Sequence, residues 1–192
     1  MEKIKIEVSA RHCHLMQEHL DQLFGAGYEL KKMKDLSQIG QFASEETVTI
    51  KTPSGVLEKV RILGPVREET QVELSMTEAR KLKLQPPIRL SGDIAGSAGC
   101  IIVGPAGEVE ITEGVIVAKR HIHCDPQTAE KHNWRQNQIL SVQTPGERGL
   151  IFHEVEMRID PEFVFVMHID TDEGNACLPG GACCEGEVII KD

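Results

Sequence analysis

The chain has 192 residues, of which 40% are hydrophobic and 27% charged, and its formal net charge is −9. These proportions are typical of a water-soluble globular protein, long enough for one domain or for two small joined ones. The acidic balance argues against a nucleic-acid partner, and the absence of a long apolar run or signal pattern argues against a membrane or export role. The six cysteines show no C-x-x-C spacing and are interpreted as reduced thiols.

Short strands and a few short helices alternate along the sequence. Alternating apolar residues predict strands around residues 4–8, 48–50, 60–62, 155–159 and 164–166. The segment 101–111 is predicted to form a hairpin whose loop is Gly-Pro-Ala-Gly. Helices are predicted at 16–24, before Gly25, at 75–82, where Ser75 and Glu78 have capping-box spacing, and at 125–132, which opens with Asp-Pro. This pattern predicts a mainly β fold with short capping helices, closer to barrels than to a doubly wound sheet.

The pattern V-x-x-R-H-x-H occurs twice, at 8–14 and at 117–123, and a predicted helix follows each copy. Residues 60–78 also overlay on residues 155–173 without a gap, so the capping-box spacing of Ser75 and Glu78 recurs at Asp170 and Glu173. The same overlay places Glu73 on His168. We interpret these correspondences as an internal duplication of a β-rich unit.

The repeated His-x-His pairs indicate metal binding. Residues i and i+2 of a strand project from the same face, so the two histidines of each pair converge. One such pair is more often incidental, but two copies behind an arginine favour zinc, which takes three protein ligands at a catalytic site. The overlay supplies the third ligand and gives two candidate triads, His12/His14/Glu73 and His121/His123/His168.

Two further clusters carry alternative interpretations. The basic group Lys31, Lys32 and Lys34 is either a solvated face or a binding surface for a small anion. The cysteines Cys177, Cys183 and Cys184 lie in a Gly-Pro-rich stretch, which we expect to be a flexible thiol-bearing tail rather than a third metal site.

Five blocks of the sequence carry a family resemblance: VSARHCHL, LGPVREETQVELS, RLSGDIAGS, VIVAKRHIHCDP and MHIDTDEGNAC. Together they resemble the PduL-type phosphate acyltransferases, the phosphate propanoyltransferase family, over about residues 4–177. The resemblance implies a single phosphotransacylase unit, residues 1–192, made of two small β-barrel halves related by duplication with a di-zinc site between them. The halves would be residues 11–118 and residues 119–192, the second completed by the strand in 1–10. Family members typically form homodimers.

The resemblance also assigns roles to individual residues. It makes the two triads the ligands of two zinc ions, although cobalt or iron also suit such sites. It makes Arg67 the residue that handles phosphate, and a guanidinium suits this role because it donates two parallel hydrogen bonds. Contacts with coenzyme A (CoA) are expected near Ser9, Lys34, Arg61, Leu63 and Asn175.

The implied reaction converts a short-chain acyl-CoA, acetyl- or propanoyl-CoA, and phosphate into an acyl phosphate and CoA. We expect direct metal-assisted attack of phosphate on the thioester, without an acyl-enzyme, because Cys13 would face away from the metal. A di-metal hydrolase and a non-catalytic zinc-stabilised scaffold are the alternatives. Relatives packaged in microcompartments carry an N-terminal targeting helix, whereas here a strand begins near Met1, so a cytoplasmic enzyme is expected. Gly174 stands where alanine is common in the family.

Overall fold

The computed structural model describes residues 2–177 and 184–189 of the chain. The fold is mainly β with a few short helices, as the sequence predicts. The chain divides into two compact units. We call residues 11–118 the central unit, and residues 1–10 together with 119–192 the terminal unit. No helix among the described residues is both long enough and apolar enough to cross a membrane.

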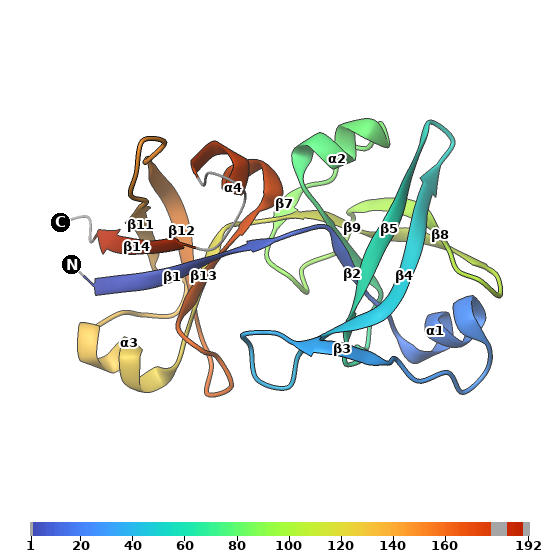
Figure 1. Ribbon diagram of the computed structural model, residues 1–192, viewed down its shortest axis with the longest axis horizontal. Coiled ribbons are helices and arrows are strands. Elements are labelled where there is room, and N and C mark those ends of the chain that lie inside the picture. The colour runs from blue at the N-terminus through green and yellow to red at the C-terminus, as the bar shows by residue number, and fades with distance from the viewer. Residues whose placement is uncertain (1, 178–183, 190–192) are drawn as a thin grey trace. The chain divides into compact units, whose positions relative to one another are not determined.

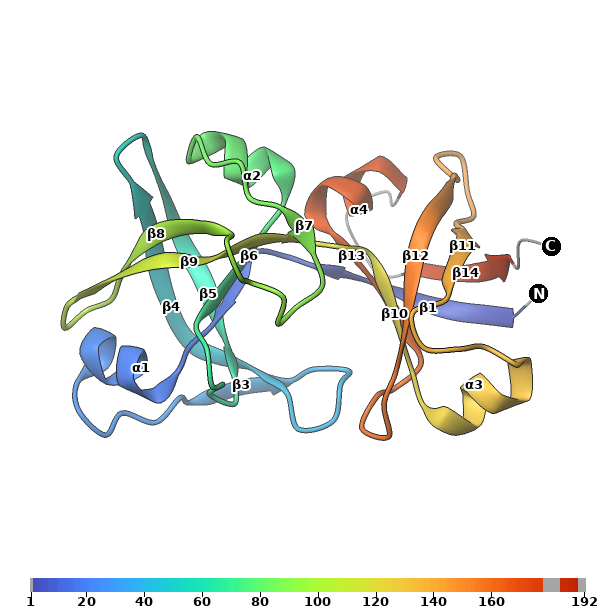
Figure 2. The ribbon, with the colours of Figure 1, turned by 180° about the vertical axis from the view of Figure 1, so that it is seen from behind.

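The central unit contains eight strands and two helices. They are β2 (His12–His14), α1 (Gln17–Phe24), β3 (Lys32–Asp35), β4 (Phe42–Thr52), β5 (Gly55–Gly64), β6 (Gln71–Leu74), α2 (Met76–Lys81), β7 (Ile88–Arg89), β8 (Ala98–Val103) and β9 (Glu108–Ala118). Because β8 pairs with both β4 and β9, six strands close into a barrel in the order β4-β5-β2-β6-β9-β8. In Figure 2, β8 runs beside β9. Strands β3 and β7 extend this sheet beyond the ring.

The terminal unit is a closed barrel in the order β1-β13-β10-β12-β11-β14. Its elements are β1 (Glu2–Ser9), β10 (His121–Cys124), α3 (Pro126–His132), β11 (Ile139–Gln143), β12 (Ile151–Ile159), β13 (Val166–Asp170), α4 (Thr171–Cys177) and β14 (Cys184–Ile189). Figure 1 shows the blue β1 running beside the orange β13 and the red β14, the strands with which it pairs. The first strand of the sequence therefore completes a barrel whose other strands come from residues 119–192.

The two barrels have the same strand topology, which accounts for the repeated sequence patterns. In the central unit the His-x-His strand β2 is antiparallel to β6, which carries the third ligand candidate, and parallel to β5. In the terminal unit β10 is likewise antiparallel to β13 and parallel to β12. The strand of the third candidate is in turn parallel to β9 or to β1. The strand that precedes each His-x-His strand belongs to the other unit, because β1 precedes β2 and β9 precedes β10. The duplication is therefore accompanied by an exchange of first strands.

Each unit has its own apolar core, because the inward-facing residues of its strands alternate with polar ones. Helix α1 packs on the central core through the fully buried Leu20 and Leu23, as its apolar stripe predicts. Gly25, with φ of 111°, ends this helix. Helix α3 packs on the terminal core through Ala129.

The predicted flexible tail at the C-terminal end is wrong for the residues that the structure describes. Residues Cys184–Ile189 form β14, which pairs with β1 and β11 and closes the terminal barrel. A side chain at the inward-facing Gly186 would collide with its neighbours, since a Cβ there would lie 2.6 Å from the Ile6 Cδ1 atom. Cys177 is buried at the end of α4, and Cys183 lies outside the described residues.

Candidate functional site

The first triad, His12, His14 and Glu73, lies in the central unit on two adjacent strands. His12 and His14 share one face of β2, and Glu73 of β6 stands directly opposite His12. The His12 Nε2 and Glu73 Oε2 atoms are 3.5 Å apart. All three side chains are buried, and their candidate ligand atoms lie within 4.8 Å of one another. The structure thus brings together the three residues that the sequence overlay selected.

A hydrogen-bond network holds the Glu73 carboxylate in place. The Gln71 amide donates to Glu73 Oε1 at 2.6 Å and to the Ser91 hydroxyl at 2.9 Å. The Gly92 N–H in turn donates to Oε1 of the Gln71 side chain at 2.7 Å. Because Gln71 occupies one carboxylate oxygen, the other is directed at His12.

Arg67 joins the same network. Its Nη1 donates to the Ser91 hydroxyl at 3.0 Å, and its backbone N–H donates to the Leu15 carbonyl at 2.9 Å. Ser91 therefore lies between the guanidinium of Arg67 and the amide that holds Glu73. The structure places Arg67 next to the first triad, where the resemblance expects a residue that handles phosphate.

Burial and neighbouring charges set the protonation states of His14 and Glu73 in the first triad. Burial lowers the pKa of His14 well below its usual value, and the nearby His12 and Arg67 add to this effect. Burial alone would raise the pKa of Glu73, but the charge and hydrogen bond of His12, with smaller contributions from His14 and Ser91, lower it overall. Near neutral pH, His14 is therefore neutral and Glu73 is ionised, as metal ligands must be.

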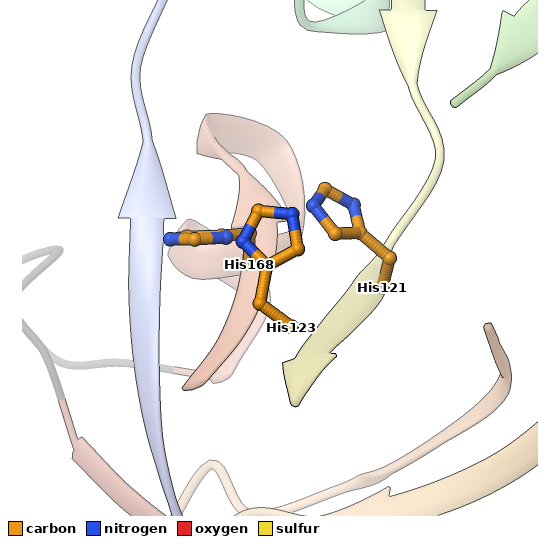
Figure 3. Close-up of side chains that lie close together, drawn as sticks. All are labelled: His121, His123 and His168. Atoms are coloured by element: carbon orange, nitrogen blue, oxygen red, sulfur yellow. The ribbon is translucent and has the colours of Figure 1, made fainter. Parts of the chain in front are cut away.

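The second triad, His121, His123 and His168, lies in the terminal unit in the same register. His121 and His123 share one face of β10, and His168 of β13 is the antiparallel partner of His121. Their candidate ligand atoms also lie within 4.8 Å of one another. Figure 3 shows the three imidazole rings gathered at one point, two from β10 and one from β13.

Neighbouring groups orient the imidazoles of β10. The Nδ1 atom of His121 is 2.8 Å from the Lys119 carbonyl oxygen, which can only accept a hydrogen bond. His121 is therefore protonated at Nδ1, and its Nε2 lone pair is left for a metal. The ring of His123 stacks on Phe163 at a centroid distance of 4.0 Å, and the guanidinium of Arg158 lies over the same phenyl ring.

The arginine that precedes each His-x-His pair has the same structural role in both units. Arg11 contacts Glu78 at 2.9 Å, and Arg120 contacts Glu173 at 2.9 Å. Each glutamate also accepts a hydrogen bond from the backbone N–H of the first residue of its capping box. The Ser75 N–H donates to Glu78, and the Asp170 N–H donates to Glu173. The arginine therefore connects the start of the His-x-His strand to the capping box that follows the strand of the third ligand candidate.

Both triads fit a divalent metal ion. Two or three imidazoles with at most one carboxylate are a typical donor set for catalytic zinc. The Nδ1 atom of His14 is buried and has no hydrogen-bond partner among the described residues, which is costly unless another group binds it. The remaining histidines have other contacts: His19 with Thr70, His132 with Glu2, and His153 with Ser141.

The five predicted CoA contacts fall in both units. Ser9 ends β1 and the exposed Asn175 lies in α4, both in the terminal unit. In the central unit, Lys34 is exposed on β3, and Leu63 pairs with Ala43. The guanidinium of Arg61 donates to the backbone carbonyls of residues 44 and 45, at 3.1 and 2.8 Å.

Reasoning from the sequence missed Gln71 and Ser91. Gln71 stands two residues before Glu73, so the same i, i+2 spacing that selected the histidines could have found it. Ser91 lies in the RLSGDIAGS block, but only the structure shows that it contacts Arg67 and Gln71.

Comparisons with known proteins identify the family of this chain. The family model for phosphate propanoyltransferase matches residues 5–179. A phosphate propanoyltransferase of Listeria monocytogenes is 48% identical over 174 residues, which cover 91% of this chain and 82% of the relative. Proteins of the same name from Thermotoga maritima and Lachnoclostridium phytofermentans are 49% and 52% identical, covering 91% and 90% of this chain and 84% and 81% of the relatives. Since these matches span most of both chains, this protein belongs to the phosphate propanoyltransferase family.

Proposed function

We propose that this enzyme, a phosphate acyltransferase by family, converts a short-chain acyl-CoA and inorganic phosphate into an acyl phosphate and CoA, and catalyses the reverse reaction. The observation that carries this proposal is the family match over residues 5–179, which includes both triads and Arg67. Acetyl-CoA and propanoyl-CoA are the proposed substrates, the latter because the matched relatives are phosphate propanoyltransferases.

We further propose that each triad holds one divalent metal ion, with zinc as the first choice. When bound, such an ion supplies Lewis acidity that polarises a thioester carbonyl and neutralises anionic oxygens. The homodimer and the cytoplasmic location that the resemblance implies stay predictions, and sedimentation analysis of the purified protein tests the first.

The residues of the chain have separate tasks in this mechanism. Arg67 binds phosphate with the two parallel N–H groups of its guanidinium, and Ser91 holds that side chain in position. A phosphate oxygen then forms a bond with the thioester carbon, the carbon–sulfur bond breaks, and CoA leaves as a thiolate. Holding phosphate in place makes the attack effectively unimolecular, which lowers the entropic part of the barrier. CoA binding is proposed near Ser9, Lys34, Arg61, Leu63 and Asn175.

The deciding measurement is CoA release from acetyl-CoA and propanoyl-CoA with and without phosphate. The transferase releases CoA only when phosphate is present and forms an acyl phosphate that hydroxylamine traps. Equal release without phosphate would instead identify a hydrolase, and metal binding without any turnover would identify a scaffold.

Replacing Arg67 with lysine tests its role. The variant keeps the positive charge but loses the paired hydrogen bonds, so we expect the KM for phosphate to rise about 10- to 100-fold, the equivalent of about 1.5–3 kcal/mol. Arg89→Lys is the matched control, because Arg89 pairs with Asp93 in the same unit. An unchanged KM for phosphate in Arg67→Lys would contradict the assignment.

A further inference from the structure

Glu7 of β1 lies beside the second triad although it belongs to none of the sequence motifs. Strand β1 runs parallel to β13, and Glu7 is the register partner of His168. The Glu7 Oε2 and His168 Nε2 atoms are 3.5 Å apart, and both side chains are largely buried, at 19% and 16% exposed. The other carboxylate oxygen of Glu7 is 2.6 Å from the Lys5 ammonium group. An ion pair thus anchors one oxygen while the other faces the imidazole.

The corresponding position of the first triad carries no charge. There β9 runs parallel to β6, and the register partner of Glu73 is Ile116, which is fully buried. In the central unit the third ligand candidate is a carboxylate and its neighbour on the parallel strand is apolar. In the terminal unit the third candidate is an imidazole and its neighbour is a carboxylate. Each triad therefore has one carboxylate at this pair of positions.

The chemistry of imidazole indicates which group donates in the contact between His168 and Glu7. A neutral imidazole donates from one ring nitrogen and accepts at the other, and a carboxylate can only accept. In Figure 3 one nitrogen of His168 faces the other two rings, and its other nitrogen faces the blue strand β1. With Nε2–H directed at Glu7, the lone pair on Nδ1 is directed into the triad.

We infer that Glu7 is a positioning residue of the second metal site and acts through His168. It fixes the tautomer and orientation of the His168 ring and makes its ligand nitrogen more basic, as carboxylates do for metal-bound histidines. This inference rests on the metal binding proposed above.

The first test is the protonation pattern of His168. Long-range ¹H–¹⁵N spectra of the zinc-loaded chain with ¹⁵N-labelled histidine distinguish a metal-bound nitrogen from an N–H nitrogen. The His168 signals are assigned by their loss in His168→Gln. We expect metal-bound Nδ1 and protonated Nε2 for His168. A metal on Nε2 of His168 would overturn the inference.

The second test is metal affinity, measured by competition with a chromophoric chelator in a His14→Ala background that leaves only the second triad intact. We expect Glu7→Ala to weaken binding about 10- to 100-fold. Glu7→Gln should weaken it less, because the amide oxygen can still accept a hydrogen bond from the Nε2–H group of His168. Glu185→Gln is the matched control, since this exposed carboxylate of the same barrel contacts Lys3 instead.

The outcomes separate this inference from the proposed function. If the chain binds metal at the second triad and Glu7→Ala binds as tightly as Glu185→Gln, the role of Glu7 is wrong while the metal sites stand. If the second triad of otherwise unaltered protein takes up no metal, the metal site itself is wrong, and the inference fails with it. Circular dichroism of the metal-free variants shows whether a loss of affinity is a loss of folding.

Discussion

Cys13 stands between two metal-ligand candidates in the sequence, yet its side chain points into the core. It is fully buried among the apolar residues of the central unit, on the opposite face of β2 from His12 and His14. Burial raises the pKa of the Cys13 thiol, and the nearby Cys100, whose own pKa burial raises to about 12, adds to this effect. A buried thiol that does not ionise is a poor nucleophile.

Replacing Cys13 with alanine should therefore leave turnover within about twofold of the unaltered enzyme. The change should lower the free energy of unfolding by about 1 kcal/mol, because it leaves a small cavity in the core. Cys100→Ala is the matched control from the same core. Mass spectrometry that finds an acyl group on Cys13 after exposure to acyl-CoA without phosphate would contradict a direct attack.

The sequence predicted which residues lie together where a regular spacing or the internal repeat relates them. His12 and His14 follow from the period of a strand, and Glu73 follows from the overlay of the two halves. Ser91 and Glu7 could not be found in this way, because neither has a counterpart in the repeat and their partners lie far away in the sequence. Their positions depend on the pairing of strands and on side-chain directions, which only the folded chain reveals.

At the scale of elements, the arginine–glutamate pairs connect a strand to a capping box. Arg11 reaches Glu78 in the central unit, and Arg120 reaches Glu173 in the terminal unit. Each pair fixes the His-x-His strand against the start of a helix. We expect this contact to hold the third ligand candidate at its distance from the pair of histidines.

Replacing Arg11 with methionine should loosen metal binding at the first triad only, and Arg120→Met should do so at the second triad only. Each change should lower the free energy of unfolding by about 1 kcal/mol, since the arginines are partly exposed. Chelator competition in variants with one intact triad measures the affinities. Arg89→Met removes an arginine–carboxylate pair outside the capping boxes and serves as the control. Equal affinities in all three variants would contradict this role.

The N-terminus of α3 gives a prediction about pH. The Asp125 side chain accepts the backbone N–H of Thr128 at 2.9 Å, and hydrogen bonding from Thr128 lowers the pKa of Asp125 below its usual 3.8. A carboxyl group whose pKa is lowered by folding stabilises the fold above its unfolded pKa, and this contribution is lost as the pH falls through the folded pKa.

Asp125→Ala should therefore cost about 1 kcal/mol near neutral pH and progressively less below about pH 3.8. Denaturant unfolding at several pH values measures this difference. Asp125→Asn keeps a capping oxygen without an ionisable group, so its stability relative to alanine should not vary with pH. A constant cost of the alanine change over the whole pH range would contradict the argument.

Among the elements, strong local signals predicted helices and hairpins correctly, whereas β3, β7, β11 and β14 were missed and the strand predicted at 164–166 begins only at Val166. The capping box of α2, the Asp-Pro start of α3 and the Gly that ends α1 are all present as predicted. Strand β14 gave no alternating apolar pattern, because one of its inward positions is Gly186. Its pairing with β1, at the other end of the sequence, is a long-range contact that local composition does not encode.

For the molecule as a whole, each unit has its own apolar core, so we expect the fold to persist without metal. Chelation should abolish turnover and lower the unfolding temperature, since a ligand present at a hundred times its Kd stabilises the folded state by about 2.7 kcal/mol. The circular dichroism spectrum should stay that of a β protein. A chain that unfolds on chelation and refolds on addition of zinc would instead fit a zinc-stabilised scaffold.

Because β1 pairs with β14, the sequence can be circularly permuted without separating paired strands. Glu2 stands opposite Val188 in antiparallel register, so the two ends of the described structure are neighbours in one sheet. A linker could therefore join the chain after β14 to the start of β1, and new ends could be opened between Ala118 and Lys119, at the boundary of the two units. In such a circular permutant every strand keeps its partners. Residues 119–192 would then be followed directly by residues 1–10, so the terminal barrel, with the second triad and Glu7, would be contiguous in the sequence.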